Sequence, residues 1–417
     1  MEKIYETAPQ PEKVILVAVN DCENEQAVRE SLDELAELVK TAGAEPVGTL
    51  IQNREKIHPG TYIGSGKIEE LKNAVEMMKA TGIVCDDELS PAQLKNLEKE
   101  LNTKIMDRTL VILDIFAKRA LTKEGKIQVE LAQLKYRAAR LVGLGSSLSR
   151  LGAGIGTRGP GEKKLEVDRR VINNRIAVLR REVNDLQNHR NLAREKRSRN
   201  PIPIVAIVGY TNAGKSTLLN TLTNAGILEE DKLFATLDPT TRNYKLPSGQ
   251  EILLTDTVGF IRKLPHHLID AFRSTLEEAK YADIILHVLD SSNEQMEAHQ
   301  EIVYETLKNL EVTDKPVITF FNKQDKLLPD CTKIFKDVNA DYTIAGSIKK
   351  RDGIDKLTEI LEKIISEQNI YIEKILPYSE AGKLQMIRQY GKLISEEYVE
   401  QGIAVQANIP RELEGKI

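Results

Sequence analysis

Tryptophan is absent from this chain of 417 residues, aromatic residues make up only 5% of it, and it contains three cysteines. Cys22, Cys85 and Cys331 are widely spaced and form no C-x-x-C pair, which argues against a disulfide framework or a zinc site and predicts buried free thiols. No apolar run approaches the roughly 18 to 20 residues that a membrane-spanning helix needs, and the N-terminus lacks the apolar core of a signal peptide. We therefore expect a soluble cytoplasmic protein without a membrane span. A minor pool held peripherally at the membrane stays an open alternative.

The remaining composition suits packed domains, because 41% of the residues are hydrophobic and the length predicts two or three domains. Strand-like and helix-like segments alternate up to about residue 109, which predicts a parallel α/β domain over residues 1–109. The expected strands cover 14–19, 45–51, 82–85 and 103–106, and the expected helices cover 24–42, 67–80 and the residues after Ser90. The Gly-rich turn at 63–67 lacks the full spacing of a phosphate-binding loop. We interpret it as a helix entry, with a second nucleotide site as the weaker alternative.

Residues 110–200 have the pattern of two long helices. Apolar residues recur at steps of four and three from Ile127 to Leu141 and resume from Leu165 to Leu186, as in coiled-coil seams. Residues 143–161, between the two runs, contain seven glycines and no acidic residue. So many glycines disfavour one continuous helix. We therefore expect an antiparallel helical hairpin with a Gly-rich loop over 143–161.

This hairpin is basic, although the chain as a whole is not. Residues 137–200 contain 16 Lys and Arg against 6 Asp and Glu, a net charge of +10, whereas the whole chain carries −4. Such a concentration is typical of a nucleic-acid contact, and the near absence of aromatic residues favours phosphate contacts with structured RNA or a duplex over base stacking. The alternative interpretation is a solvated helix surface without a partner.

A phosphate-binding loop begins the next domain, which we place over residues 201–370. Residues 209–216 read G-Y-T-N-A-G-K-S, which matches the P-loop pattern G-x-x-x-x-G-K-[ST]. The loop follows an apolar run of strand type at 203–208 and precedes an amphipathic helical segment. In this arrangement backbone N–H groups surround the phosphates, Lys215 reaches the β- and γ-phosphates, and Ser216 ligates Mg²⁺.

Two later motifs indicate guanine and a γ-phosphate sensor. Residues 322–325 read N-K-Q-D after a buried strand, and the Asp325 carboxylate can accept hydrogen bonds from guanine N1–H and its amino group, which adenine cannot donate. Residues 256–259 read D-T-V-G at the end of another strand, where Asp256 would hold Mg²⁺ through water and Gly259 would sense the γ-phosphate. A switch threonine should lie in 234–242, and chemistry alone does not choose among Thr236, Thr240 and Thr241.

Together these motifs resemble the HflX family of ribosome-associated GTPases. The likeness rests on G-Y-T-N-A-G-K-S, F-A-T-L-D-P-T-T-R at 234–242, D-T-V-G-F-I and N-K-Q-D, with the Gly-rich hairpin before them. It implies a Ras-like GTPase domain, Thr236 as the second Mg²⁺ ligand beside Ser216, and the 50S ribosomal subunit as the partner. It also implies that stalled or idle 70S ribosomes are split, with rRNA contacted by the basic hairpin.

The resemblance fixes the expected site. Catalysis would depend on Lys215, Asp256, Gly259 and Phe260. The nucleotide would be bound by Gly209, Tyr210, Thr211, Asn212, Ala213, Gly214, Lys215, Ser216, Thr217, Phe234, Ala235, Thr236, Leu237, Asp238, Asp256, Thr257, Val258, Gly259, Asn322, Lys323, Gln324, Asp325, Ser347, Ile348 and Lys349. The base-closing loop, S-A-K in the family, aligns with 347–349, although 345–347 is a competing alignment. Ile348 keeps the backbone amide that the loop uses but adds bulk, so we expect a lower nucleotide affinity.

Phe260 departs from Ras-like GTPases, where a glutamine orients the attacking water. Because phenylalanine cannot bond a water, we expect slow intrinsic hydrolysis, with activation by the ribosome acting on a free loop at 260–265. Asn212 offers a K⁺ site as a second source of activation; the alternative is that its side chain only forms hydrogen bonds with the P-loop backbone.

Residues 371–417 should form a small α/β appendage with a helix near 380–391 and a strand at 404–409. We expect the protein to be a monomeric GTP hydrolase. The alternatives are an ATP-driven RNA remodeller, a ribosome-assembly GTPase and a binding module that is only stabilised by nucleotide.

Overall fold

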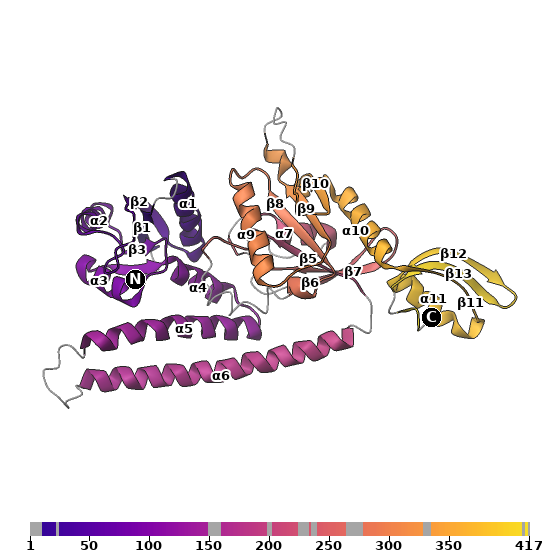
Figure 1. Ribbon diagram of the computed structural model, residues 1–417, viewed down its shortest axis with the longest axis horizontal. Helices are drawn as coiled ribbons and strands as arrows, with labels where there is room; N and C mark the ends of the chain where they lie inside the picture. The colour runs from indigo at the N-terminus through magenta and orange to yellow at the C-terminus, as the bar shows by residue number, and fades with distance from the viewer. Residues whose placement is uncertain are drawn as a thin grey trace, which may run out of the picture. The chain divides into compact units, whose positions relative to one another are not determined.

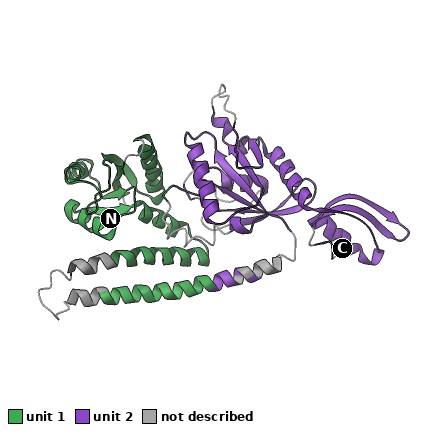
Figure 2. Ribbon diagram, in the orientation of Figure 1, with its two compact units in different colours: residues 1–184, 262–271 green, residues 185–261, 272–417 purple. Residues whose placement is uncertain are grey.

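The computed structural model forms two compact units, one of residues 1–184 with 262–271 and one of residues 185–261 with 272–417 (Figure 2). The structure describes residues 11–21, 25–148, 160–197, 202–223, 233–234, 240–263, 278–327, 335–410 and 413–415. Among them, no helix is long and apolar enough to cross a membrane. Among the described residues, the first unit has one sheet and the second has two, each with its own apolar core.

The first unit contains a four-stranded parallel sheet in the order β2-β1-β3-β4. Its strands are β1 (Lys13–Asn20), β2 (Glu45–Asn53), β3 (Gly82–Cys85) and β4 (Lys104–Asp107), and its helices are α1 (Glu25–Ala42), α2 (Ser65–Met78), α3 (Pro91–Leu101) and α4 (Arg108–Arg119). The apolar run from Val14 to Val19 is buried on both faces of the sheet, as its sequence predicted for a central parallel strand. The predicted strands of this domain are confirmed to within about two residues at each end.

Local signals explain where two of these helices begin. Ser90 accepts a hydrogen bond from the backbone of Gln93, whose side chain accepts one from Ser90, and Pro91 follows at the first helical position. Gly64 is the N-cap of α2, so the turn at 63–67 is a helix entry, as the sequence indicated.

A buried ion cluster, which the sequence did not reveal, lies at the end of β3 in the first unit. The Arg108 guanidinium, 1% exposed, donates to Asp86 at 2.6 Å and also to Glu34. Lys263, one of the residues that the GTPase sequence contributes to this unit, donates to Asp86 at 2.6 Å and to Asp87 at 2.7 Å. Burial alone would raise the pKa of Asp86, but the two cations outweigh burial and lower it. Asp86 is therefore charged and paired with both cations at neutral pH.

Two long helices follow, α5 (Lys123–Leu148) and α6 (Pro160–Arg197), and they lie side by side (Figure 1). Arg175 of α6 donates to Glu130 of α5 at 2.7 Å. The expected loop bounds of 143–161 are wrong, because α5 continues through Gly143 and Gly145 and α6 begins at Pro160. Glycine lowers helix propensity by about 1 kcal/mol without forbidding a helix, and proline starts one readily. The connecting residues 149–159, with Arg150 and Arg158, lie outside the described chain, so the Gly-rich loop stays a prediction.

The second unit contains a six-stranded sheet in the order β10-β9-β8-β5-β7-β6, parallel except for the β6–β7 pair. Its strands are β5 (Ile204–Gly209), β6 (Thr240–Lys245), β7 (Glu251–Asp256), β8 (Ile284–Asp290), β9 (Val317–Asn322) and β10 (Tyr342–Ala345), and its helices are α7 (Lys215–Thr223), α9 (Met296–Asn309) and α10 (Ile354–Gln368). Alternate residues of β5, such as Val205 and Ile207, join Leu218 of α7 and Leu361 of α10 in one apolar core. The carboxyl ends of the central strands thus carry the loops of a nucleotide site.

The chain ends in a three-stranded antiparallel sheet in the order β11-β13-β12, with α11 (Ala381–Tyr390) packed on one face (Figure 1). Its strands are β11 (Ile370–Leu376), β12 (Lys392–Val399) and β13 (Gly402–Ile409). The sequence indicated α11 and β13 but not β11 and β12. Both missed strands are half exposed and carry charged residues among the apolar ones, which weakens the period-two pattern.

Candidate functional site

The P-loop joins β5 to α7 and needs glycine at two positions. A Cβ on Gly209 would lie 2.3 Å from Val288 O, and one on Gly214 would lie 2.4 Å from Asn322 Nδ2. Gly214 also has φ of +105°, which other residues rarely adopt. The loop can therefore approach the neighbouring strand and the base loop only because these side chains are missing.

Lys215 begins α7 and is buried, at 6% exposure. Its Nζ donates to Tyr210 O at 2.8 Å. Burial lowers the pKa of Lys215 to about 8, against the opposing effect of the Asp256 carboxylate. A phosphate group beside this ammonium would offset the burial and keep the lysine charged.

Two oxygen groups suited to Mg²⁺ lie together beside the P-loop. Ser216 Oγ donates to Asp256 Oδ2 at 2.9 Å, and Asp256 is buried at the carboxyl end of β7. Hydroxyl and carboxylate oxygens are the ligands that this ion prefers, so the pair fits a magnesium site. The third expected group, Thr236, lies outside the described residues, as do Ala235, Leu237 and Asp238. Phe234 is described and is buried.

The loop that would bind the base is tied to the P-loop by side chains. Asn322 Nδ2 donates to Ala213 O at 2.9 Å, and Lys323 Nζ donates to Asn212 O at 2.8 Å. Lys323 also pairs with Asp290, at the end of β8, at 2.8 Å. Asp290 was not predicted from the sequence; its only signal is an acidic residue that ends a buried strand at the edge that carries the site.

The segment 347–349 closes the same site, which favours the S-I-K alignment. Ser347 Oγ donates to Asp325 Oδ1 at 2.6 Å, and this bond is the main cause that lowers the pKa of Asp325. The Ile348 N–H donates to Asn322 Oδ1 at 3.0 Å. The Ile348 side chain is 1% exposed and packs in the same core cluster as Ala213 of the P-loop, and its effect on nucleotide affinity stays a prediction.

The sequence predicted a free loop after the D-T-V-G motif, and this is wrong at its first residues. Phe260 and Ile261 are buried, at 2% and 3% exposure. The Phe260 N–H donates to Gly209 O at 3.1 Å, and the Thr211 N–H donates to Phe260 O at 2.9 Å. Phe260 is therefore paired with the P-loop through its backbone, whereas residues 264–277 lie outside the described chain.

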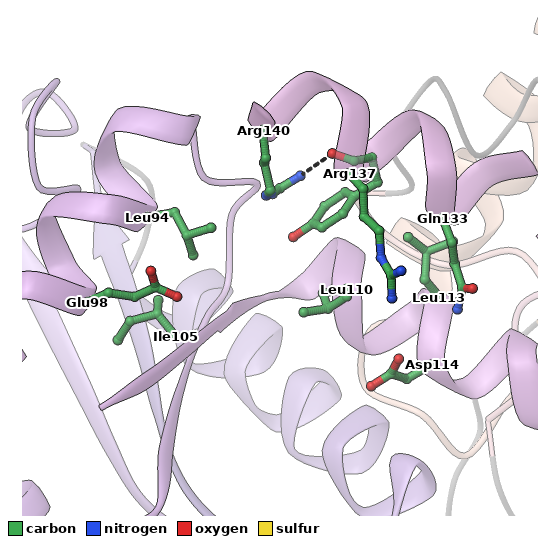
Figure 3. Close-up of a pocket in the computed structure, with 10 residues that line it drawn as sticks. Leu94, Glu98, Ile105, Leu110, Leu113, Asp114, Gln133, Arg137 and Arg140 are labelled. Carbon is green, nitrogen blue, oxygen red and sulfur yellow. Dashed lines mark hydrogen bonds between the residues drawn. The ribbon is translucent and has the colours of Figure 1, made fainter. Parts of the chain in front are cut away.

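A separate cavity of about 280 Å³ lies in the first unit among α3, α4 and α5 (Figure 3). Tyr136 and Arg140 are among the residues that line it, and the guanidinium lies 3.1 Å from the centre of the tyrosine ring. Arg140 also pairs with Asp107 at 2.6 Å. None of the residues that line this cavity belongs to the nucleotide motifs. The described residues likewise contain no group of three His, Cys, Asp or Glu that could hold a metal.

Three family profiles match successive parts of the chain. Residues 29–117 match the profile described as GTP-binding GTPase N-terminal, and residues 119–197 match GTP-binding GTPase Middle Region. Residues 204–323 match the profile described as 50S ribosome-binding GTPase. The matches cover the first sheet without β1, the two long helices, and the P-loop domain as far as the end of β9.

Whole-length relatives are also similar to this chain. A protein of Lacrimispora saccharolytica called GTPase HflX is 64% identical over 99% of this chain and 97% of its own length. Proteins of the same name from Caldanaerobacter subterraneus and Escherichia coli are 50% and 39% identical, over 99% and 91% of this chain and 94% and 90% of their own lengths. The similarity extends to the regions outside the nucleotide motifs.

Proposed function

The chain belongs to the HflX family of GTPases and is a GTP-hydrolysing enzyme, and from this premise we propose that it binds the 50S subunit and splits stalled or idle 70S ribosomes. The observation that supports this most is the joining of a guanine-type loop to the P-loop, through Asn322 and Lys323, in a chain that also carries an exposed basic helix. Such a protein would work in the cytoplasm, where ribosomes are.

The described side chains support distinct roles in hydrolysis. Lys215 holds the β- and γ-phosphates, while Asp325 accepts from the base. Ser216 would hold Mg²⁺ directly and Asp256 would hold it through water, with Thr236, outside the described residues, expected as a further ligand; the ion would neutralise phosphate charge. Gly259 meets the γ-phosphate through its N–H. None of these groups takes a proton from the attacking water, so positioning by the switch segments limits the rate.

A monovalent cation is a second group that fits the P-loop. The Asn212 side chain is exposed, and no hydrogen bond to its amide is present in the described part of the chain. Its carbonyl oxygen would therefore be one ligand for K⁺, which would supply positive charge that stabilises the transition state. GTP turnover in matched KCl and NaCl, for wild type and Asn212→Ala, tests this role; equal rates in both salts would exclude it.

The basic surface of α6 supports a contact with rRNA. Arg169, Arg170, Arg180 and Arg181 are all exposed on this helix. Adjacent arginines along one helix suit the regularly spaced phosphates of a structured RNA, and each phosphate contact releases counterions. The 50S subunit offers such RNA, which supports it as the partner.

The deciding experiment is the sedimentation of 70S ribosomes with the protein and GTP, GDP or a non-hydrolysable GTP analogue. Splitting predicts that 70S particles convert to free subunits with GTP or the analogue, but not with GDP. Unchanged 70S with bound protein would favour the silencing of ribosomes, and binding only to immature 50S particles would favour assembly. An ATP-driven RNA remodeller, the other class, predicts conversion with ATP and none with GTP.

A further inference from the structure

One hydroxyl group of the phosphate-binding loop is buried without a partner in the protein. Thr211 is 7% exposed, and no group in the described part of the chain forms a hydrogen bond with its Oγ1. Buried hydroxyl groups are nearly always bonded, because burying one without a partner costs free energy. Thr211 is the third residue of G-Y-T-N-A-G-K-S, in the loop that would surround the phosphates. Its hydroxyl is therefore suited to bond a group of the substrate.

Thr211 lies against the glycine that would sense the γ-phosphate. A Cβ on Gly259 would lie 2.8 Å from Thr211 Cγ2 and 2.9 Å from Thr211 Cα. The same point lies 2.9 Å from Lys215 Nζ. Because Cγ2 and Oγ1 are attached to the same carbon atom, the hydroxyl belongs to this cluster. It therefore lies near the two groups that would contact the γ-phosphate.

Thr211 is also bonded to the residue that replaces the glutamine of Ras-like GTPases. The Thr211 N–H donates to Phe260 O at 2.9 Å. In Ras-like enzymes the glutamine at this place orients the attacking water. The Phe260 side chain is 2% exposed and has no polar atom for that task. The backbone bond thus holds a hydroxyl-bearing residue beside the residue that lacks the polar group.

A hydroxyl group can make both hydrogen bonds that orienting a water requires. Its oxygen accepts a hydrogen bond from the water, and its O–H donates one to a γ-phosphate oxygen. The neighbouring Lys215 ammonium is only a donor, so it can bind the phosphate but cannot accept a bond from the water. Thr211 keeps its own proton throughout, and the proton of the water passes to the phosphate. A water held in line with the γ-phosphorus in this way reacts with a lower barrier.

We propose that the Thr211 hydroxyl orients the attacking water of GTP hydrolysis, in place of the glutamine that Ras-like GTPases have where this chain has Phe260. The inference rests on the proposed function, because it requires a γ-phosphate beside Lys215 and Gly259. The hydroxyl acts in the transition state and contributes little to the binding of GDP, which has no γ-phosphate. Its removal should therefore change the rate of hydrolysis much more than the affinity for nucleotide.

The test compares Thr211→Val, which replaces the hydroxyl by a methyl group of similar size, with Thr211→Ser, which keeps the hydroxyl. Single-turnover GTP hydrolysis in KCl is measured for each variant. The affinities for GDP, for a non-hydrolysable GTP analogue and for GDP with aluminium fluoride, a mimic of the transition state, are measured as well. We expect Thr211→Val to slow hydrolysis about tenfold or more and to weaken the binding of the mimic by a similar factor. Its affinities for GDP and the analogue should stay within about twofold of the wild type, and Thr211→Ser should hydrolyse GTP within about threefold.

The matched control is Thr221→Val on α7, which removes a hydroxyl that donates to Thr217 O at 2.8 Å within its own helix. It should leave the rate and the affinities unchanged. If Thr211→Val does not fold, Thr211→Ala also removes the hydroxyl and should be equally slow. A wild-type rate in the variant without the hydroxyl, or equal losses in Thr211→Val and Thr211→Ser, would overturn the orienting role and leave Thr211 as packing. A wild-type protein that binds no guanine nucleotide would instead overturn the proposed site itself.

Discussion

Ser347 and Asp325 are joined by a hydrogen bond of 2.6 Å, which fixes the carboxylate at the mouth of the base site. The bond lowers the pKa of Asp325, so this group is ionised at neutral pH and can only accept hydrogen bonds. Guanine offers two donors to such a group, N1–H and the 2-amino group. The choice of base therefore depends on the direction of two hydrogen bonds.

Replacing this acceptor should change the preferred base. Asp325→Asn presents an NH₂ donor, which suits the additional carbonyl of xanthine, so we expect XDP to bind and GDP affinity to fall about a hundredfold or more. Competition between labelled GDP and XDP measures both effects. The control is Ser347→Ala, which removes the orienting hydroxyl but should keep the preference for guanine. Equal binding of ATP and GTP by the wild type would contradict the guanine assignment.

The lowered pKa of Lys215 predicts a pH dependence of nucleotide binding. The free protein has a Lys215 pKa of about 8, and the bound phosphates need the charged form. Binding is therefore at full strength well below pH 8 and weakens above it, because the protein must then take up a proton. Between pH 7.0 and 8.5 we expect GDP affinity to fall about fourfold, measured by titration calorimetry. Lys215→Arg, which stays charged, should show no such fall; the same fall in both proteins would assign it to another group.

His287 predicts an acid sensitivity of the second unit. Its ring is fully buried against Tyr304, and no hydrogen bond to either ring nitrogen is present in the described chain. Burial lowers its pKa to about 4. Because the pKa of His287 in the folded protein lies below its unfolded value of roughly 6.5, protonation favours the unfolded state. The free energy of unfolding therefore has its full value above pH 6.5 and decreases as the pH falls toward 4. About 2 kcal/mol should be lost between pH 7.5 and 5.

The measurement is urea unfolding at both pH values, followed by a probe in the second unit. His287→Leu removes the titrating ring at nearly the same volume, so its loss between pH 7.5 and 5 should be smaller by that amount. Identical losses in the two proteins would show that other groups control the acid response.

The arginines of α6 predict the strength of ribosome binding. Exchanging Arg180 and Arg181 for alanine should weaken 50S binding and leave GDP affinity unchanged. The slope of log affinity against log salt concentration should become shallower by up to about one for each lost phosphate contact. Pelleting with 50S subunits over a range of KCl concentrations measures this. The matched control is Arg175→Ala, because Arg175 is paired with Glu130 and offers less charge to RNA. Equal binding by all three proteins would leave the basic helix as plain surface.

The sequence was most informative where a nucleotide motif follows a segment with a clear hydrophobic pattern. Gly209, Gly214 and Asn322 were identified from spacing alone, because phosphate and base binding restrict the residue types at these positions. The central strands were equally clear, since a strand buried on both faces needs a continuous apolar run. These features depend on local chemistry that a few residues specify.

Features that depend on contacts between distant residues could not be read in this way. The partner of Asp86 lies 177 positions along the chain, at Lys263, and no local pattern connects the two. Phe260 was interpreted from its side chain, whereas its backbone makes the contacts. The helical Gly143 and Gly145 were misread because glycine lowers helix propensity by only about 1 kcal/mol and does not forbid a helix.

The C-terminal sheet has a consequence for self-association. Both β11 and β12 are edge strands, and unpaired edges are templates on which identical chains can add and aggregate. The register of β12 shifts between Leu393 and Ser395, which breaks the regular row of donors and acceptors. On the other edge, Glu373 and Lys374 place exposed charges in the middle of β11. A second copy approaching either strand would meet an irregular or charged border, so the sheet can remain open at both sides while the protein stays dispersed at high concentration.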